Sequence, residues 1–169
     1  MNVIVTPHGA GEAVIDWGAG ARHAAVGRSG IGAKLREGDG VTPVGVFHIR
    51  RAWYRADRLA RPQSAVEFAP LSPDDGWCDA PGDPNYNKLV KHPYPVSAEH
   101  LWLDSRVYDI IGIVGFNDDP VVPGAGSAIF LHLARDGYPP TAGCVALTDH
   151  DLRAALAQFR PQDRVRITG

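Results

Sequence analysis

The chain is poor in cysteine and contains no long apolar run. Cys78 and Cys144 are the only thiols among 169 residues, so at most one disulfide can form, and only in an oxidising compartment. One such pair is a thin framework for a chain of this size. No apolar stretch approaches the roughly 20 residues that a membrane-spanning helix needs, so no membrane span is expected.

Several binding signatures are also missing. The formal net charge is −2 and no basic run is interleaved with aromatic residues, so no nucleic-acid partner is expected. No Gly-x-Gly-x-x-Gly motif opens a helix, and no Cys-x-x-Cys or His-Glu-x-x-His motif occurs. His132, Cys144 and His150 are three conceivable zinc ligands without a fourth, so no metal site is expected.

The beginning of the chain lacks a secretory signal. Residues 1–14, MNVIVTPHGAGEAV, have the pattern of a strand, without a basic start, an apolar stretch and a small-residue cleavage site. Three readings stay open: a cytoplasmic protein, a signal already removed, or export by another route. The length and the apolar content of 44% suit one domain over residues 1–169, with a sizeable core.

What is present indicates a loop-rich β protein. The 19 glycines and 14 prolines are scattered without a period. Short apolar or alternating segments predict strands at Val3–Thr6, Glu12–Asp16, Ala21–Gly27, Val46–Arg50, His100–Leu103, Val107–Gly115, Ser127–Leu133, Gly143–Leu147 and Arg164–Thr168. Tyr54–Ala60 suggests a short helical turn, and the turn-rich, aromatic segment Trp77–Asn87 an ordered surface loop.

One helix is predicted near the C-terminus. Thr148 can cap it, and Arg160-Pro161 ends it. The apolar residues between these ends recur at the helical spacing: Leu152, Ala155, Leu156 and Phe159.

The clearest chemical signal lies between residues 129 and 147. His132 stands in the apolar run IFLHL and Cys144 in GCVAL, separated by a polar loop. A thiol and an imidazole brought close together are the minimum for cysteine acyl-transfer chemistry. Spacing alone supports equally well the structural alternative, in which His132 is a core histidine and Cys144 a buried structural thiol.

Two motifs resemble one family. The sequence TAGCVA at 141–146, with FLH at 130–132, resembles the catalytic motif of the L,D-transpeptidases, the YkuD-domain enzymes of bacterial peptidoglycan. The sequence GVTPVGVF at 40–47 resembles the Thr-Pro-x-Gly-x-Phe strand of the same family. The chain departs from the usual motif in two ways. Ala142 stands where a histidine is common, and the His132-to-Cys144 spacing of 12 positions (144 − 132) is shorter than usual. We therefore expect a divergent branch.

The resemblance implies a single mainly-β domain, a β-sandwich or barrel with a helix near the C-terminus. It implies that Cys144 attacks a peptidoglycan stem peptide to form a thioester, with His132 as general base and then acid. Gly143 lets the backbone approach the substrate, and backbone N–H groups stabilise the oxyanion. No metal or organic cofactor is implied, and the expected location is the periplasm or the cell wall.

Two alternatives keep part of this reading. Water or a free D-amino acid as acceptor would make the protein an L,D-carboxypeptidase or an exchange enzyme. Loss of activity would leave a non-catalytic wall-binding module, an alternative that Ala142 favours and that the intact His132 and Cys144 oppose.

Substrate-binding candidates surround the two motifs. Arg135, three residues after His132, is placed to bind a carboxylate, although a solvated loop arginine is the commoner case. The other candidates are two residues of the cysteine motif and four of the aromatic loop: Thr141, Ala142, Trp77, Asp79, Tyr86 and Asn87. For the aromatic loop, plain packing of the rings is an equal alternative. Tyr108 and Asn117 are candidates to orient His132.

Overall fold

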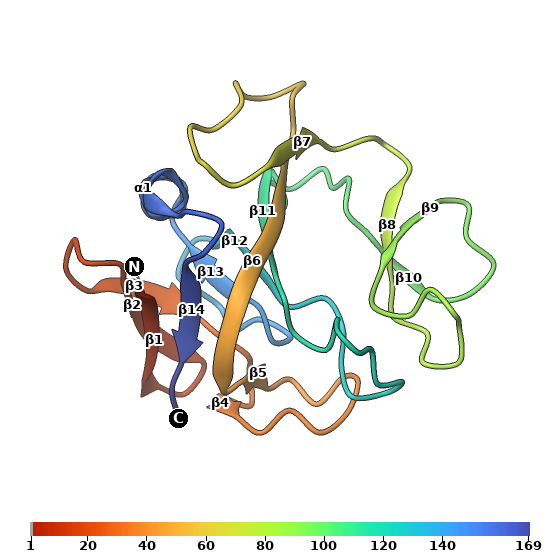
Figure 1. The fold of residues 1–169 in the computed structure, drawn as a ribbon, viewed down its shortest axis with the longest axis horizontal. Coiled ribbons are helices and arrows are strands. Elements are labelled where there is room, and N and C mark those ends of the chain that lie inside the picture. Colours follow the sequence, from red (N-terminus) through yellow and green to blue (C-terminus); the bar gives the residue numbers. More distant parts are fainter. Residues whose placement is uncertain (1) are drawn as a thin grey trace.

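The computed structural model describes residues 2–169, and its centre is a closed barrel of eight strands (Figure 1). Around the barrel their order is β11-β12-β13-β3-β2-β1-β14-β6, and pairing of β6 with β11 closes the ring. The pairs β1–β14 and β12–β13 are parallel and the others antiparallel. The strands are β1 (Asn2–Gly9), β2 (Glu12–Asp16), β3 (Arg22–Ala25), β6 (Gly45–Tyr54), β11 (Ile110–Val114), β12 (Phe130–Leu133), β13 (Val145–Leu147) and β14 (Arg164–Ile167). The predicted mainly-β fold is confirmed, and of the two expected forms, a sandwich or a barrel, the chain adopts the barrel.

The longest strand, β6, joins the two ends of the sheet. Its first residues, Gly45 to His48, pair with β14, and the part from Ile49 to Tyr54 pairs with β11. A register shift lies between Gly112 and Val114, and such an irregularity bends a strand and increases its twist. The short strand β7 (Phe68–Pro70) pairs in parallel with the last residues of β6.

Side-chain alternation divides the strands into an inner and an outer face. Leu131 and Leu133 of β12 belong to the cluster inside the barrel, whereas Phe130 and His132 lie on the outer face. Val165 and Ile167 of β14 are buried inside. The apolar face of α1 (Asp149–Gln158) joins the same inner cluster. It is the single α-helix in residues 2–169, and the Thr148 hydroxyl caps it by accepting the Asp151 N–H, as predicted.

Two small sheets lie outside the barrel. A three-stranded sheet, β10-β8-β9, is formed by β8 (Asp75–Cys78), β9 (Leu89–Lys91) and β10 (Ala98–His100), seen at the right of Figure 1. It covers part of the barrel's outer face, since the ring of Trp77 packs edge-on against the ring of Phe130, with 5.3 Å between the two ring centroids. The parallel pair of β4 (Ile31–Gly32) and β5 (Thr42–Pro43) closes the base of a loop over residues 33–41.

Several predicted element bounds are wrong. The sequence predicts a strand at His100–Leu103. The chain instead forms β10 from Ala98 to His100 and then turns inward, because Leu101 is fully buried. Trp77 and Cys78 lie in strand β8 and not in a loop. The short helical turn predicted at Tyr54–Ala60 is present, because the Arg55 carbonyl accepts the N–H groups of Arg58 and Leu59, but Tyr54 itself is the last residue of β6.

Other bounds differ because of local backbone geometry. The predicted strand from Ser127 starts only at Phe130, because Ala128 has a left-handed conformation with φ of 54°. The strand expected from Val107 begins at Ile110, after a turn in which Asp109 N–H bonds to Arg106. Strands β4, β5, β7 and β9 were not predicted, because two or three residues carry too little periodicity.

The barrel interior should dominate the stability of the fold. Leu147 is fully buried there, so Leu147→Ala should lower the free energy of unfolding by about 2–5 kcal/mol. Ile4 on β1 is 40% exposed, and Ile4→Ala is the matched control, with an expected loss below about 1 kcal/mol. Urea denaturation measures both, and similar losses for the two variants would contradict the assignment of faces.

Candidate active site

One pocket contains both predicted catalytic side chains. Its volume is about 640 Å³, and its lining includes Cys144 and His132 from the outer face of the barrel. The other walls come from the loop after β4, from Glu99 of the three-stranded sheet, from residues 127–129, and from the loop that contains Arg135 and Thr141. The structure therefore brings together parts of the chain that are far apart in sequence.

The parallel pairing of β12 with β13 places the imidazole and the thiol on one face. His132 is opposite Ala146, so Cys144, two residues earlier, lies level with Phe130. The Phe130 N–H donates to Cys144 Sγ at 3.4 Å. Residues two apart on a strand share a face, and both side chains therefore point out of the barrel into the same pocket.

The Cys144 thiol is neutral at rest. It is 7% exposed and donates to the Ala128 carbonyl at 3.2 Å. Burial, the largest cause, and the negative charge of Glu99 together raise the pKa of Cys144 to about 12, although the Phe130 N–H and the charge of Lys34 act in the opposite direction. A thiolate, which is the nucleophilic form, must be generated by removing this proton.

The His132 imidazole is also neutral, and it can accept a proton. Its Nδ1 lies 3.0 Å from the Leu133 carbonyl, which can only accept, so Nδ1 carries the hydrogen and Nε2 is the basic nitrogen. Burial, the largest cause, and the charge of Arg135 together lower the pKa of His132 to about 4, although the bond to Leu133 acts in the opposite direction. The ring of Tyr108 packs edge-on against the imidazole at 5.3 Å.

The backbone before the cysteine is held by two threonines. The Thr42 hydroxyl donates to the Gly143 carbonyl at 2.8 Å and accepts the Gly27 N–H at 2.8 Å. The Thr141 hydroxyl donates to the Cys144 carbonyl at 2.6 Å and accepts the Gly143 N–H at 3.1 Å. A Cβ on Gly143, whose φ is 146°, would lie 2.9 Å from the Val41 carbonyl oxygen, so only glycine fits this turn.

This geometry links the two sequence motifs. Thr42 belongs to the segment 40–47, and its hydroxyl bonds directly to the backbone that precedes Cys144. A family model described as the L,D-transpeptidase catalytic domain, YkuD, matches residues 10–167. The chain belongs to the YkuD family. The resemblance predicted from the sequence is thereby confirmed, and a search of curated proteins found no match.

The family consists of L,D-transpeptidases, which implies peptide substrates for this YkuD domain. Across residues 2–169, no helix is long and apolar enough to cross a membrane. In the same range no group of three or more histidine, cysteine, aspartate or glutamate residues is arranged to hold a metal ion. The His150 side chain, considered above as a third zinc ligand, is 88% exposed beside Asp151.

Both thiols of the YkuD domain are free. Cys78 lies in β8 of the outer sheet and Cys144 just before β13 of the barrel. The disulfide considered from the sequence is therefore absent, and Cys144 stays available as a thiol. Burial also raises the pKa of Cys78, so this second thiol is likewise neutral at rest.

The predicted substrate-binding residues separate into two groups. Arg135, Thr141, Ala142 and Asp79 line the pocket, and Arg135 and Ala142 are exposed. Asp79 has one buried carboxylate oxygen, Oδ1, without a hydrogen-bond partner. Trp77, Tyr86 and Asn87 are buried and are not part of the lining. Contact with a substrate stays a prediction for all seven.

The second group supports the wall of the pocket from behind. The Asn87 carboxamide oxygen accepts the Trp77 Nε1–H at 2.9 Å and the Ala128 N–H at 3.1 Å. The Tyr86 hydroxyl accepts the Gly126 N–H at 3.0 Å. These bonds hold residues 126–128, and the Ala128 carbonyl is the group that accepts the Cys144 thiol.

Sequence reasoning missed three residues near the thiol: Thr42, Lys34 and Glu99. Thr42 lies inside a recognised motif, but nothing local indicates its partner Gly143, 101 positions away. Lys34 and Glu99 had no signal, because isolated charged residues are common on surfaces. Asn117 bonds to the Val122 and Gly126 carbonyls, so it organises its own loop instead of orienting His132.

Removing the Thr42 hydroxyl should be costly. Thr42→Val leaves the Gly27 N–H and the Gly143 carbonyl without a partner in a fully buried site, so we expect a loss of about 2–4 kcal/mol in unfolding free energy. Thr168→Val, which removes one bond to Val5 near the end of the chain, is the control, with a loss below about 1 kcal/mol. Equal losses in urea denaturation would contradict a special role for Thr42.

The depressed pKa of His132 should make stability depend on pH. The pKa falls from 6.5 to about 4 on folding, so the unfolded chain binds more protons between these values and stability decreases as the pH falls. The wild type should lose about 2–3 kcal/mol from this residue between pH 7.5 and 4.5. His132→Asn keeps a donor for the Leu133 carbonyl but does not titrate. The unfolding free energy of this variant should therefore fall by about 2–3 kcal/mol less than that of the wild type over the same pH range. The other histidines are common to both proteins, and identical pH slopes would refute the shift.

Proposed function

We propose that this protein is a peptidoglycan L,D-transpeptidase, with Cys144 as nucleophile and His132 as general base and acid. The observation that carries the proposal is the pair itself. A thiol and a neutral imidazole with a basic Nε2 share one face and one pocket in a chain of the YkuD family.

The first half-reaction forms a thioester. His132 Nε2 takes the proton from Cys144 Sγ, and the sulfur attacks the carbonyl carbon on the L-centre side of a bond to a D-residue. The tetrahedral intermediate then breaks its C–N bond, and the amine of the leaving D-amino acid takes the proton from His132. Since the Gly143 N–H is bonded to Thr141, the Cys144 N–H is the donor proposed for the oxyanion.

The second half-reaction transfers the acyl group. A side-chain amine of a second stem peptide, such as diaminopimelate, attacks the thioester carbonyl while His132 removes its proton. The C–S bond breaks, and the proton returns to the sulfur. Water or a free D-amino acid in the place of this amine would give the carboxypeptidase or exchange activity with the same residues.

The pocket walls suggest how the substrate is held. The Arg135 guanidinium at the mouth suits a substrate carboxylate, which it can bind through two parallel hydrogen bonds. Thr141 and Ala142 border the thiol, and Asp79 offers a carboxylate oxygen to an N–H group. Trp77, Tyr86 and Asn87 contribute by supporting residues 126–128. Because the substrate is the cell wall, the proposed place of action is the periplasm or the cell wall.

A carbapenem tests the nucleophile, because a thiolate opens its strained lactam to a thioester. Intact mass spectrometry of the folded wild type should show one covalent adduct. The adduct should be lost in Cys144→Ala and retained in Cys78→Ser, the matched control for the second free thiol. A folded wild type that forms no adduct, or an adduct that persists in Cys144→Ala, would count against Cys144.

Purified muropeptides separate the reaction classes. Cross-linked dimers that depend on Cys144 support transpeptidation, whereas trimmed monomers support the carboxypeptidase. Binding to sacculi without any Cys144-dependent product would support the wall-binding module instead.

A further inference from the structure

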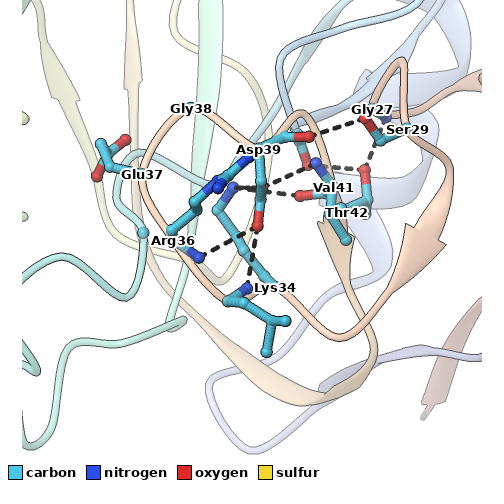
Figure 2. Close-up of polar contacts among 12 residues, drawn as sticks. Gly27, Ser29, Lys34, Arg36, Glu37, Gly38, Asp39, Val41 and Thr42 are labelled. Atoms are coloured by element: carbon cyan, nitrogen blue, oxygen red, sulfur yellow. Dashed lines mark hydrogen bonds and ion pairs between the residues drawn. The ribbon is translucent and has the colours of Figure 1, made fainter.

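A buried lysine lies beside the nucleophile. Lys34 belongs to the loop between β4 and β5, and its side chain is only 3% exposed although it lines the same pocket as Cys144. Its ammonium donates to Asp39 Oδ1 at 2.6 Å and to the Val41 carbonyl at 3.4 Å (Figure 2). These two acceptors use two of its three protons and leave one.

The lysine side chain runs between two glycines. A Cβ on Gly126 would lie 2.4 Å from Lys34 Cε, and a Cβ on Gly143 would lie 3.7 Å from Lys34 Nζ. Gly143 directly precedes Cys144, so the ammonium lies against the backbone of the turn that carries the nucleophile. Any other residue at position 126 would displace this side chain.

Asp39 fixes the position of the cation. Its carboxylate accepts the backbone N–H groups of Arg36 and Val41 in addition to the Lys34 ammonium, as Figure 2 shows. It also accepts the Leu35 N–H. Glu37 points away from this network in the same view and instead accepts the Tyr86 hydroxyl. A charge held in this way needs little rearrangement when a neighbouring atom becomes negative.

The thiol needs such a neighbour. Its pKa of about 12 and the His132 pKa of about 4 disfavour transfer of the proton, and Glu99 adds a negative charge nearby. The titratable groups that share the pocket with Cys144 come from every element packed around it: Lys34, Glu37, Asp79, Glu99, Tyr108, His132 and Arg135. Arg135 is exposed and disfavours a protonated His132, so Lys34 is the buried cation of this set.

We propose that Lys34 is the electrostatic partner of Cys144, and that its ammonium stabilises the negative charge on Sγ when His132 removes the thiol proton. The proposal rests on the proposed function, in which Cys144 is the nucleophile. In this step the S–H bond breaks, the proton moves to Nε2 and the electron pair stays on sulfur. A fixed charge that shares a partly dry pocket with an ionisable group shifts the pKa of that group by about one unit or more.

Alkylation of Cys144 by iodoacetamide across a range of pH measures thiolate formation without any substrate, and peptide mass spectrometry assigns the adduct. The double variant Lys34→Met/Asp39→Asn removes both charges, while the carboxamide oxygen introduced at position 39 can still accept backbone N–H groups. We expect its alkylation rate at pH 8 to fall by about tenfold and its profile to move to higher pH. Lys34→Arg, which keeps the charge, should lose less than about threefold.

Asp39→Asn alone is the decisive control. It removes a negative charge and retains the lysine, so the alkylation rate should stay equal or rise. A role confined to fastening the loop predicts that Asp39→Asn and the double variant react equally slowly, and that result would overturn the proposal. An unchanged pH profile in a double variant that unfolds at the wild-type temperature would overturn it as well.

The outcome is independent of the reaction class. A wild type that forms no muropeptide product but shows the predicted alkylation shifts would refute the proposed function and retain the role of Lys34. Cross-linking activity in the wild type, together with alkylation profiles that do not shift in the variants, would support the proposed function and refute the role of Lys34.

Discussion

One hydroxyl group holds the candidate site together. Thr42 accepts the N–H of Gly27 and donates to the carbonyl of Gly143. One hydroxyl thus joins three separate parts of the chain, at residues 27, 42 and 143. A carbonyl that is bonded in a buried site has one orientation, because every alternative leaves it unpaired. The position of Cys144 in the pocket depends on this constraint, and so does the close approach of the Lys34 loop to Gly143.

Burial determines the resting charge of the site. The outer sheet and the segment that precedes β12 enclose the thiol and the imidazole, and both remain neutral because neither charge is well solvated there. In the proposed reaction, proton transfer must therefore create an ion pair from two neutral groups. For that step, the proposed partner Lys34, a fixed and buried cation, suits the pocket better than an exposed cation such as Arg135.

The aromatic loop shows how a site can depend on residues that do not line it. Trp77, Tyr86 and Asn87 are buried, and their polar atoms hold the backbone of residues 126–128. That backbone provides the Ala128 carbonyl to the thiol. Polar groups of this kind are satisfied inside the protein and so define one geometry for the wall of the pocket.

The sequence by itself determined the local features. Period-two alternation predicts β2 and β14, helical spacing with the Thr148 cap predicts α1, and two motifs predict the YkuD family together with a thiol and an imidazole on neighbouring strands. These features depend on residues only a few positions apart, and a linear pattern records them.

Only the tertiary structure decided the rest. The parallel register of β12 and β13 places His132 and Cys144 on one face. Both thiols are free, and β10 ends where the chain turns to bury Leu101. The hydrogen bond between Thr42 and Gly143 spans 101 positions of the chain. The contact between Lys34 and Gly143 spans a similar number of positions. Such contacts follow from closure of the barrel, which no local pattern encodes, because pairing between distant strands depends on the packing of the whole chain.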